Sequence, residues 1–309
     1  MFETAAMTKE QLAAELRGKL SPETLLRRDE PLAKKTTLRV GGPADFFVEP
    51  SSEGDLSRVL QFCGEKELPL FVLGRGSNLL IKDSGIRGVV VSLTHPNFSS
   101  IKVEGEFLHC GAGAKLKTIA VEARKNNLVG LEFLEGIPGN LGGALRMNAG
   151  AMGSATFNVL EKIRVMDWAG KIQGMVRADI NAEYRSCPLL KDQIALSALL
   201  KGKAGMGEVV AERMKTYSAK RWESQPKEPS AGCIFKNPPT VSAGKLIEEL
   251  GLKGTNVGGA RVSEIHGNFI VNDGSATAQD VLDLIDLIKK RAMSARGIEL
   301  RTEVEIIGE

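Results

Sequence analysis

Glycine is unusually dense in one apolar stretch of the chain, residues 136–153, which reads GIPGNLGGALRMNAGAMG and is called the glycine-rich segment below. It holds six glycines and two asparagines, and Arg146 is its one charged side chain. Surface loops are polar, so this composition is not typical of one. Glycine permits a positive φ and a close backbone approach, with N–H groups directed at a ligand. The segment therefore predicts a buried site for the diphosphate and ring system of a large cofactor. The alternative is a tight turn between two core strands.

Composition excludes several classes of protein. The chain has 309 residues, 42% hydrophobic and 26% charged, which predicts a globular protein of two or three domains. A net charge of +3 without a Lys/Arg run argues against a nucleic-acid partner. The N-terminal sequence MFETAAMTKEQLAAELRGKL predicts neither a signal peptide nor a membrane span, and no membrane partner is expected. The chain has four cysteines without a CxxC pair and only three histidines, so no metal site is expected. The thiols are expected to be reduced, in the cytoplasm.

The first two thirds of the chain predict helices inserted among many short strands, which is typical of an α+β fold. Thr8-x-x-Gln11 is a capping box for a helix over 8–17, and Ser51 and Ser52 cap a second helix. A β-rich run over 36–40 meets Gly41-Gly42-Pro43 and resumes as a strand. Further elements are a helix over 115–127 and strands within 69–81, 88–93, 101–105, 106–111, 158–168 and 194–200.

Two short glycine patterns do not satisfy the dinucleotide-binding fingerprint. That fingerprint requires a strand, G-x-G-x-x-G and then a helix. After GRGSN (74–78) the chain is again β-like, and the pattern that begins at Gly111 has Leu116 where the third glycine is needed. The sequence therefore predicts a cofactor site of another kind.

The C-terminal third predicts a small α+β domain. A helix through Tyr217 and Trp222 leads into 221–239, which holds four prolines and predicts an irregular loop. A short helix over 244–251 and a strand over 269–272 follow. Thr277-x-x-Asp280 opens a helix that ends at Gly297 and whose Ile/Leu stripe is core, and 302–307 is a last strand.

Eight motifs in order make the chain similar to the shorter form of the UDP-N-acetylenolpyruvoylglucosamine reductase (UDP-N-acetylmuramate dehydrogenase) family. The motifs span residues 36–308, nearly the whole chain. They are TTLRVGGPADFF, LGRGSNLLI, GIPGNLGGALRMNAGA, EYRSC, PSAGCIFKNP, AGKLIEELGLKG, GGARVSEIHGNFIVN and GIELRTEVEIIG.

The resemblance implies a two-subdomain FAD-binding fold of the vanillyl-alcohol-oxidase (PCMH) type and a small C-terminal α+β domain for the substrate. The expected boundaries are an N-terminal helical extension over 1–22, an FAD-binding domain over 23–205 (subdomains about 23–86 and 87–205), and a substrate-binding domain over 206–309. It also implies noncovalent FAD, NADPH as co-substrate, a UDP-sugar enolpyruvate as substrate, a cytoplasmic location, and no obligate protein partner.

The resemblance also assigns binding residues. The expected substrate contacts are Tyr184, Lys236 and Asn237. The expected FAD contacts are Gly41, Gly42, Gly74, Arg75, Gly76, Ser77, Asn78, Leu79, Ile137, Pro138, Gly139, Asn140, Gly142, Gly143, Ala144, Asn148 and Gly150.

Three catalytic residues are expected from the motifs. Arg185 in EYRSC matches the arginine that faces the substrate carboxylate; a strand-end salt bridge is the alternative. Glu303 matches the catalytic glutamate, with Glu305 and Glu299 as nearby alternatives and Glu305 expected on the same strand face. Cys233 stands where the family has the proton-donating serine. A thiol is a stronger acid than a hydroxyl, so we expect Cys233 to donate the proton.

Alternatives to these assignments stay open. Ser230 is a second possible proton donor, and an inert buried Cys233 would indicate an inactive relative. The chain also departs from the family at Met152 and Cys187, where tyrosine and serine are usual. The rival functions are another flavin oxidoreductase of the same fold, or a flavin- or nucleotide-binding relative without turnover.

Overall fold

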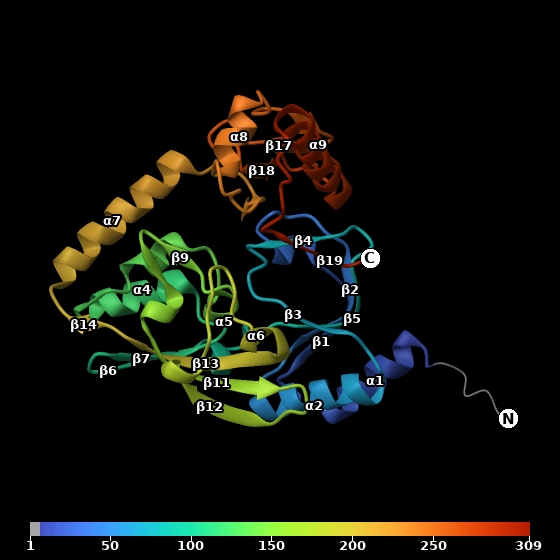
Figure 1. Ribbon diagram of the computed structural model, residues 1–309. Coiled ribbons are helices and arrows are strands. Elements are labelled where there is room, and N and C mark those ends of the chain that lie inside the picture. The colour runs from blue at the N-terminus through green and yellow to red at the C-terminus, as the bar shows by residue number, and fades with distance from the viewer. Residues whose placement is uncertain (1–6) are drawn as a thin grey trace. The chain divides into compact units, whose positions relative to one another are not determined.

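The computed structural model describes residues 7–309 (Figure 1), which form two compact units. The N-terminal unit consists of residues up to 30 together with 44–74 and 88–217, and the C-terminal unit consists of 31–43, 75–87 and 218–309. Residues 31–43 and 75–87 thus pack with the C-terminal unit, although a single division at residue 206 would assign them to the N-terminal part of the chain. The expected domain boundaries, after residues 22, 86 and 205, stay a prediction. The first six residues of the expected extension over 1–22 lie outside the described residues.

The N-terminal unit contains a four-stranded sheet of order β1-β2-β5-β3 and a five-stranded sheet of order β12-β11-β13-β7-β6 (Figure 1). The pairs of the five-stranded sheet are antiparallel, and Ile163 lies opposite Ala198 in the register of β11 and β13. The strands of the N-terminal unit are β1 Leu25–Pro31, β2 Pro43–Glu49, β3 Leu70–Val72, β5 Ile86–Val91, β6 Ile101–Glu104, β7 Phe107–Gly111, β8 Leu128–Val129, β9 Gly150–Ala151, β10 Ser154–Ala155, β11 Leu160–Asp167, β12 Ile172–Val176, β13 Gln193–Lys201 and β14 Lys203–Ala204.

The helices along these strands begin where the sequence predicts capping. Thr8 and Gln11 form the expected capping box of α1, and the side chain of Ser52 accepts the N–H of Asp55 at the start of α2. The N-terminal unit's helices are α1 Lys9–Lys19, α2 Glu53–Glu65, α3 Pro96–Ser99, α4 Leu116–Lys125, α5 Leu141–Arg146 and α6 Leu189–Asp192, with 3-10 turns η2 Glu132–Gly136, η3 Thr156–Asn158 and η4 Arg177–Asp179.

A fully buried carboxylate, Asp55, ties α2 to the loop before β1. Burial alone would raise the pKa of this carboxyl, but hydrogen bonds from Ser21, Thr24 and Ser51 outweigh it and hold the pKa well below its usual range. The Asp55 oxygens accept from Ser21 N (3.1 Å), Ser21 Oγ (2.6 Å), Thr24 Oγ1 (2.8 Å), Ser51 Oγ (3.0 Å), Ser52 Oγ (3.1 Å) and Arg58 Nη1 (2.8 Å).

The C-terminal unit is built on an antiparallel sheet of order β15-β18-β17-β16, and β19 pairs in parallel with β4. The boundary between the units falls inside α7 Gly207–Ser224, at Tyr217. The other elements of this unit are η1 Ala33–Lys35, β4 Leu79–Ile81, β15 Ser230–Cys233, α8 Ala243–Glu249, β16 Asn256–Val257, β17 Ala260–Val262, β18 Phe269–Asn272, α9 Ala278–Arg296 and β19 Glu305–Ile307.

Helix α9 follows its prediction closely. Thr277 and Asp280 form the capping box, and Gly297 ends the helix in the left-handed region at φ 63. The Asp83 carboxylate also accepts the N–H groups of Ala278 (2.8 Å) and Gln279 (2.9 Å), which adds negative charge at the helix N-terminus. The predicted apolar stripe is core: Val281, Leu284, Ile285 and Ile288 are buried.

Three expected local structures are wrong. Residues 36–40 form no strand, because Arg39 adopts a positive φ of 60, which interrupts an extended chain. The loop expected over 221–239 contains strand β15, which pairs with β18. The last strand begins at Glu305 rather than at 302, and Glu303 lies in a bend.

Gly42 is required by backbone packing, which gives a testable result. A Cβ on Gly42 would lie 2.0 Å from the carbonyl oxygen of Asp83 and 2.6 Å from the N of Gly85, so neither neighbour can move without a backbone shift. We expect Gly42→Ala to lower the free energy of unfolding by about 3 kcal/mol. A Cβ on Gly64, inside α2, meets nothing within 4 Å. Gly64→Ala is the matched control and should raise the free energy by about 0.5–1 kcal/mol in urea unfolding. Equal effects of the two substitutions would contradict the packing argument.

Candidate active site

Two of the three expected catalytic residues lie on segments of the C-terminal unit that are joined by backbone hydrogen bonds. The N–H of Glu303 donates to the carbonyl of Ile234 (2.8 Å), which directly follows Cys233. The Nδ2 of Asn78 donates to the carbonyl of Glu303 (3.2 Å), and the carbonyl of Asn78 accepts the N–H of Glu305 (3.0 Å). The expected proton donor, the expected glutamate and one expected FAD contact therefore lie on neighbouring segments.

The alternatives to Glu303 have other surroundings. Glu305 lies in β19, opposite Leu79 of β4, and Glu303 lies outside that strand. Strand alternation therefore does not place Glu303 and Glu305 on one face, and that expectation is wrong. Glu299 is exposed and lies 3.5 Å from the guanidinium of Arg301. Glu303 is half-buried. Its backbone N–H is hydrogen-bonded to Ile234 and its backbone carbonyl to Asn78, so the position of its backbone is fixed.

Cys233 differs from the other three cysteines in exposure. Cys63, Cys110 and Cys187 are buried, whereas Cys233 is half-buried at the end of β15. Burial raises the pKa of the Cys63 and Cys110 thiols to about 12, which keeps them protonated and unreactive. The rival donor Ser230 is also half-buried and lies opposite Val271 of β18. Among the four thiols, Cys233 is therefore the one that is partly exposed.

Arg185, the third expected catalytic residue, lies in the N-terminal unit at the tip of a tight turn. Glu183 and Ser186 exchange backbone hydrogen bonds (2.8 and 3.3 Å) across Tyr184 and Arg185. Arg185 adopts a left-handed φ of 57, and its guanidinium carbon lies 5.2 Å from the ring centre of Tyr184. A left-handed non-glycine residue costs on the order of 1 kcal/mol and often marks a functional position. The approach of Arg185 to Cys233 and Glu303 stays a prediction.

The Arg185 turn is anchored to the glycine-rich segment. The N–H of Cys187 donates to the carbonyl of Arg146 (2.9 Å), and the Nδ2 of Asn148 donates to the carbonyl of Glu183 (3.2 Å). Asn148, an expected FAD contact, also accepts the N–H of Phe157 through its Oδ1 (3.3 Å). The segment and the expected carboxylate-facing arginine are thus parts of one hydrogen-bonded assembly.

The glycine-rich segment folds differently from its prediction. Positive φ values occur in it at Gly153, Asn148 and Met152, whereas Gly142 and Gly143 lie in the short helix α5. Two N–H groups of the segment donate to protein carbonyls: Leu141 N to Ala114 O (2.9 Å) and Gly142 N, of an expected FAD contact, to Ala112 O (2.7 Å).

The expected FAD glycines separate into two groups when an added Cβ is considered. At Gly74 and Gly143 the Cβ meets no atom within 4 Å, so these glycines face open space that a ligand can use. At five others the missing Cβ is explained by protein packing; the nearest atoms are Ile81 Cβ for Gly41 (2.7 Å), Asp83 O for Gly42 (2.0 Å), Thr36 Cα for Gly76 (2.9 Å), Ala112 Cβ for Gly142 (3.2 Å) and Ser154 O for Gly150 (2.6 Å).

Two buried acceptors beside the first turn of α4 also suit a bound flavin nucleotide. Asn140 Oδ1 and Glu135 Oε2 lack a hydrogen-bond partner among residues 7–309. The Asn140 amide is oriented by its Nδ2, which donates to Gly113 O (2.7 Å), and the other Glu135 oxygen lies 3.0 Å from Lys117 Nζ. A buried acceptor without a donor is costly. The hydroxyl and N–H groups of FAD would satisfy both oxygens, whereas its diphosphate, which has only acceptors, would not. The residues present therefore fit FAD.

Several other expected contacts lie in loops of the C-terminal unit. Lys236 and Asn237 are exposed after β15, and Asn237 Oδ1 accepts the N–H of Ala243 at the start of α8 (3.0 Å). Arg75 is exposed, and the carbonyl of Ser77 lies 3.9 Å from a Cβ built on Gly232. His266, expected to be structural, accepts the N–H of Asn268 at its Nδ1 (3.1 Å).

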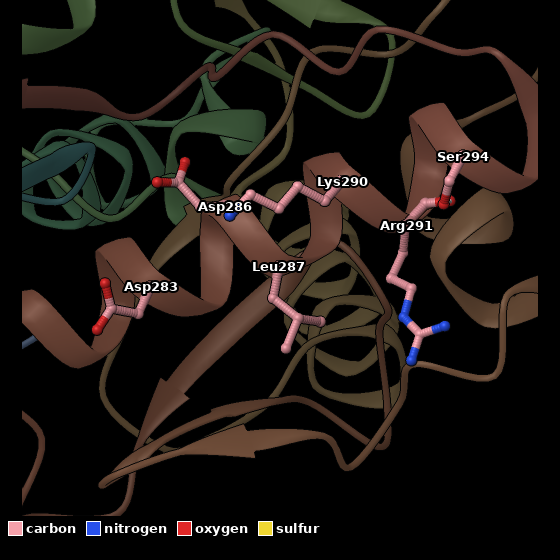
Figure 2. A pocket seen from close by; sticks show the side chains of 6 residues that line it. All are labelled: Asp283, Asp286, Leu287, Lys290, Arg291 and Ser294. Carbon is pink, nitrogen blue, oxygen red and sulfur yellow. The ribbon is translucent and has the colours of Figure 1, made fainter.

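A surface hollow on α9 contains none of the expected site residues. Figure 2 shows its lining on one face of α9: Asp283, Asp286, Leu287, Lys290, Arg291 and Ser294. These charges of both signs indicate an ordinary solvent-facing helix surface. Within residues 7–309 no group of His, Cys, Asp and Glu side chains could hold a metal ion, and no helix is both long and apolar enough to cross a bilayer.

Two family models match the chain. The model of an FAD binding domain matches residues 44–175, and that of the C-terminal domain of UDP-N-acetylenolpyruvoylglucosamine reductase matches residues 225–307. Together they confirm the predicted α+β fold, with a two-subdomain FAD-binding region followed by a small C-terminal domain.

Relatives match over nearly the whole chain. The UDP-N-acetylenolpyruvoylglucosamine reductase of Heliobacterium modesticaldum is 44% identical over 285 residues, which cover 91% of this chain and 90% of the relative. That of Bacillus subtilis strain 168 is 42% identical over 283 residues, covering 91% and 93%. The crystal structure of the enzyme from Thermus caldophilus superposes with a TM-score of 0.79 at 36% identity, covering 93% of this chain and 99% of the other. This chain belongs to the UDP-N-acetylenolpyruvoylglucosamine reductase family.

Proposed function

We propose that this chain reduces UDP-N-acetylglucosamine enolpyruvate to UDP-N-acetylmuramate with NADPH, and that Arg185, Cys233 and Glu303 carry the reduction of the substrate. The cofactor is FAD, in keeping with the FAD-binding domain over 44–175. The observation that carries the residue assignment is the shared attachment of Cys233 and Glu303 to Ile234, beside Asn78.

The reaction sets two requirements for the protein. When bound, FAD supplies hydride to the vinyl terminus of the substrate after its own reduction by NADPH. Negative charge then develops on the carbon next to the carboxylate, so the protein must stabilise this charge and must protonate that carbon.

Each proposed residue meets one requirement. The planar Arg185 guanidinium binds the carboxylate in bidentate fashion and stabilises the developing charge. Cys233 donates the proton from Sγ to the carbon. Glu303 is the third proposed catalytic residue, and its backbone N–H is hydrogen-bonded to the carbonyl of Ile234, next to Cys233. Tyr184, Lys236 and Asn237 bind the sugar nucleotide.

The reaction product is a precursor of peptidoglycan. We therefore place the chain in cell-wall synthesis in the cytoplasm, with effects on cell shape and division. The proposal requires small-molecule substrates and no obligate protein partner.

Anaerobic half-reactions test the proposal. NADPH should bleach the oxidised flavin absorbance of the purified yellow protein, and the enolpyruvyl substrate should restore it. Bleaching without restoration would identify a flavin-binding relative without turnover. Restoration by a hydroxy-acid or sugar oxidase substrate, or by oxygen alone, would identify another flavoenzyme of this fold. A protein that carries no flavin would overturn the proposal as a whole.

A further inference from the structure

A buried asparagine in the C-terminal unit, Asn268, makes three hydrogen bonds to one dipeptide, Ile234–Phe235. Asn268 is 3% exposed. Its Oδ1 accepts the N–H of Phe235 (2.9 Å), its Nδ2 donates to the carbonyl of Phe235 (2.8 Å), and its backbone carbonyl accepts the N–H of Ile234 (2.8 Å). Its own N–H donates to His266 Nδ1 (3.1 Å), so Asn268 is itself held in place.

The Ile234–Phe235 dipeptide directly follows β15, where the regular pairing with β18 ends. The register between β15 and β18 shifts between Ser230 and Cys233, and Gly232 in the shifted part has a positive φ of 78. Beyond Cys233 the chain leaves the ladder. The side-chain amide of Asn268 there takes the place of a strand partner, because it supplies one donor and one acceptor to the same residue.

The dipeptide is also linked directly to both expected acid residues. Cys233 directly precedes Ile234, and the carbonyl of Ile234 accepts the N–H groups of Glu303 (2.8 Å) and Val304 (3.4 Å). A shift of Ile234 therefore moves Cys233 and Glu303 together with it. Misplacement of a reacting group by about 1 Å costs on the order of 100-fold in rate.

The geometry points to Asn268 as a positioning residue that holds Cys233 and Glu303 in register for the reduction of the substrate. This inference rests on the proposed function. Asn268 touches neither expected acid side chain; it acts through the backbone of Ile234 and Phe235.

Asn268→Asp is the primary test. It preserves shape and one acceptor but places a carboxylate oxygen against the Phe235 carbonyl, which repels it. In anaerobic stopped-flow experiments we expect reoxidation of the reduced flavin by the enolpyruvyl substrate to slow about 100-fold. Flavin content and flavin reduction by NADPH should stay within about twofold of wild type, because Asn268 is not placed to affect either. If Asn268→Asp does not fold, Asn268→Ser, which cannot span both Phe235 groups, should give the same pattern.

A matched control separates positioning from general stability. Asn272 is also buried (4% exposed) on β18, and its amide donates to Leu38 O and accepts the N–H groups of Gly274 and Ala276. Asn272→Asp should lower Tm comparably but leave reoxidation per bound flavin within about threefold of wild type. Equal slowing of reoxidation by Asn268→Asp and Asn272→Asp would overturn the inference.

A double-mutant cycle gives a readout that a structural role would not move. Because Asn268 places Cys233 as well as Glu303, Asn268→Asp should slow reoxidation by a smaller factor once Cys233→Ala is present, and the remaining slowing reports the misplacement of Glu303. Fully multiplicative effects would overturn the positioning role. Failure of wild type to be reoxidised by the substrate would instead count against the proposed function, so the two failures are distinguishable.

Discussion

Cys233→Ala is expected to slow reoxidation of the reduced flavin by the enolpyruvyl substrate about 10²–10⁴-fold, while NADPH reduces the flavin at the wild-type rate. A positioned general acid contributes rate factors of this size, and Cys233 is the half-buried thiol beside Glu303. Hydride transfer from NADPH to the flavin does not need that proton. Anaerobic stopped-flow absorbance of the two half-reactions measures both rates in the same preparation.

Two further variants sharpen this test. Cys233→Ser restores the residue usual in the family and should recover most of the lost rate if a proton donor is what the position supplies. Ser230→Ala removes the rival donor and should leave both half-reactions close to wild type. Normal reoxidation in Cys233→Ala, or a large loss in Ser230→Ala, would exclude Cys233 as the donor.

Asp55→Asn is expected to cause the largest loss of stability, about 3–5 kcal/mol in the free energy of unfolding at pH 7. The substitution keeps the size of the side chain but leaves the Arg58 guanidinium and several hydroxyl donors without their carboxylate. Urea unfolding followed by fluorescence measures the change. Asp192→Asn, an exposed carboxylate of the same unit, is the matched control and should change the free energy by less than about 0.5 kcal/mol.

The pH dependence of this loss follows from the lowered pKa of Asp55. The unfolded chain binds a proton at Asp55 near pH 3.9, and the folded chain does so only at lower pH. The stabilisation is therefore complete above about pH 5 and is lost as pH falls through the folded pKa. The difference between wild type and Asp55→Asn should narrow from pH 5 toward pH 2. A difference that stays constant over this range would show that the charge of Asp55 is not its source.

Local signals in the sequence predicted the helix ends well. Thr8, Ser52, Thr277 and Gly297 cap helices where predicted, because capping depends on residues within one turn. Segments whose structure depends on distant partners were predicted less well. Strand β15 is paired by β18, some 40 residues further along the chain, so the prolines around it and its glycine indicated a loop.

The candidate site shows the same limit. Motif resemblance predicted Cys233 and Glu303, but their common attachment to Ile234 and Asn78 depends on pairings between segments far apart in the chain. Asn268 was missed because it carries no charge and lies in a turn directly before β18; an asparagine next to a run of apolar strand residues was the available signal. The composition of the glycine-rich segment predicted that other atoms approach its backbone closely. It could not show whether those atoms belong to the protein or to a ligand.

The parallel pairing of β4 with β19 has a consequence for how this chain matures on the ribosome. Asn78 is hydrogen-bonded to Glu303, 225 positions later, so β4 emerges long before its partner is synthesised. Until translation ends, an apolar strand edge stays uncovered in the nascent polypeptide, a state that favours aggregation and recruits chaperones. A chain that terminates before residue 305 would therefore lack β19 and be prone to aggregation, rather than function as a slightly shortened protein.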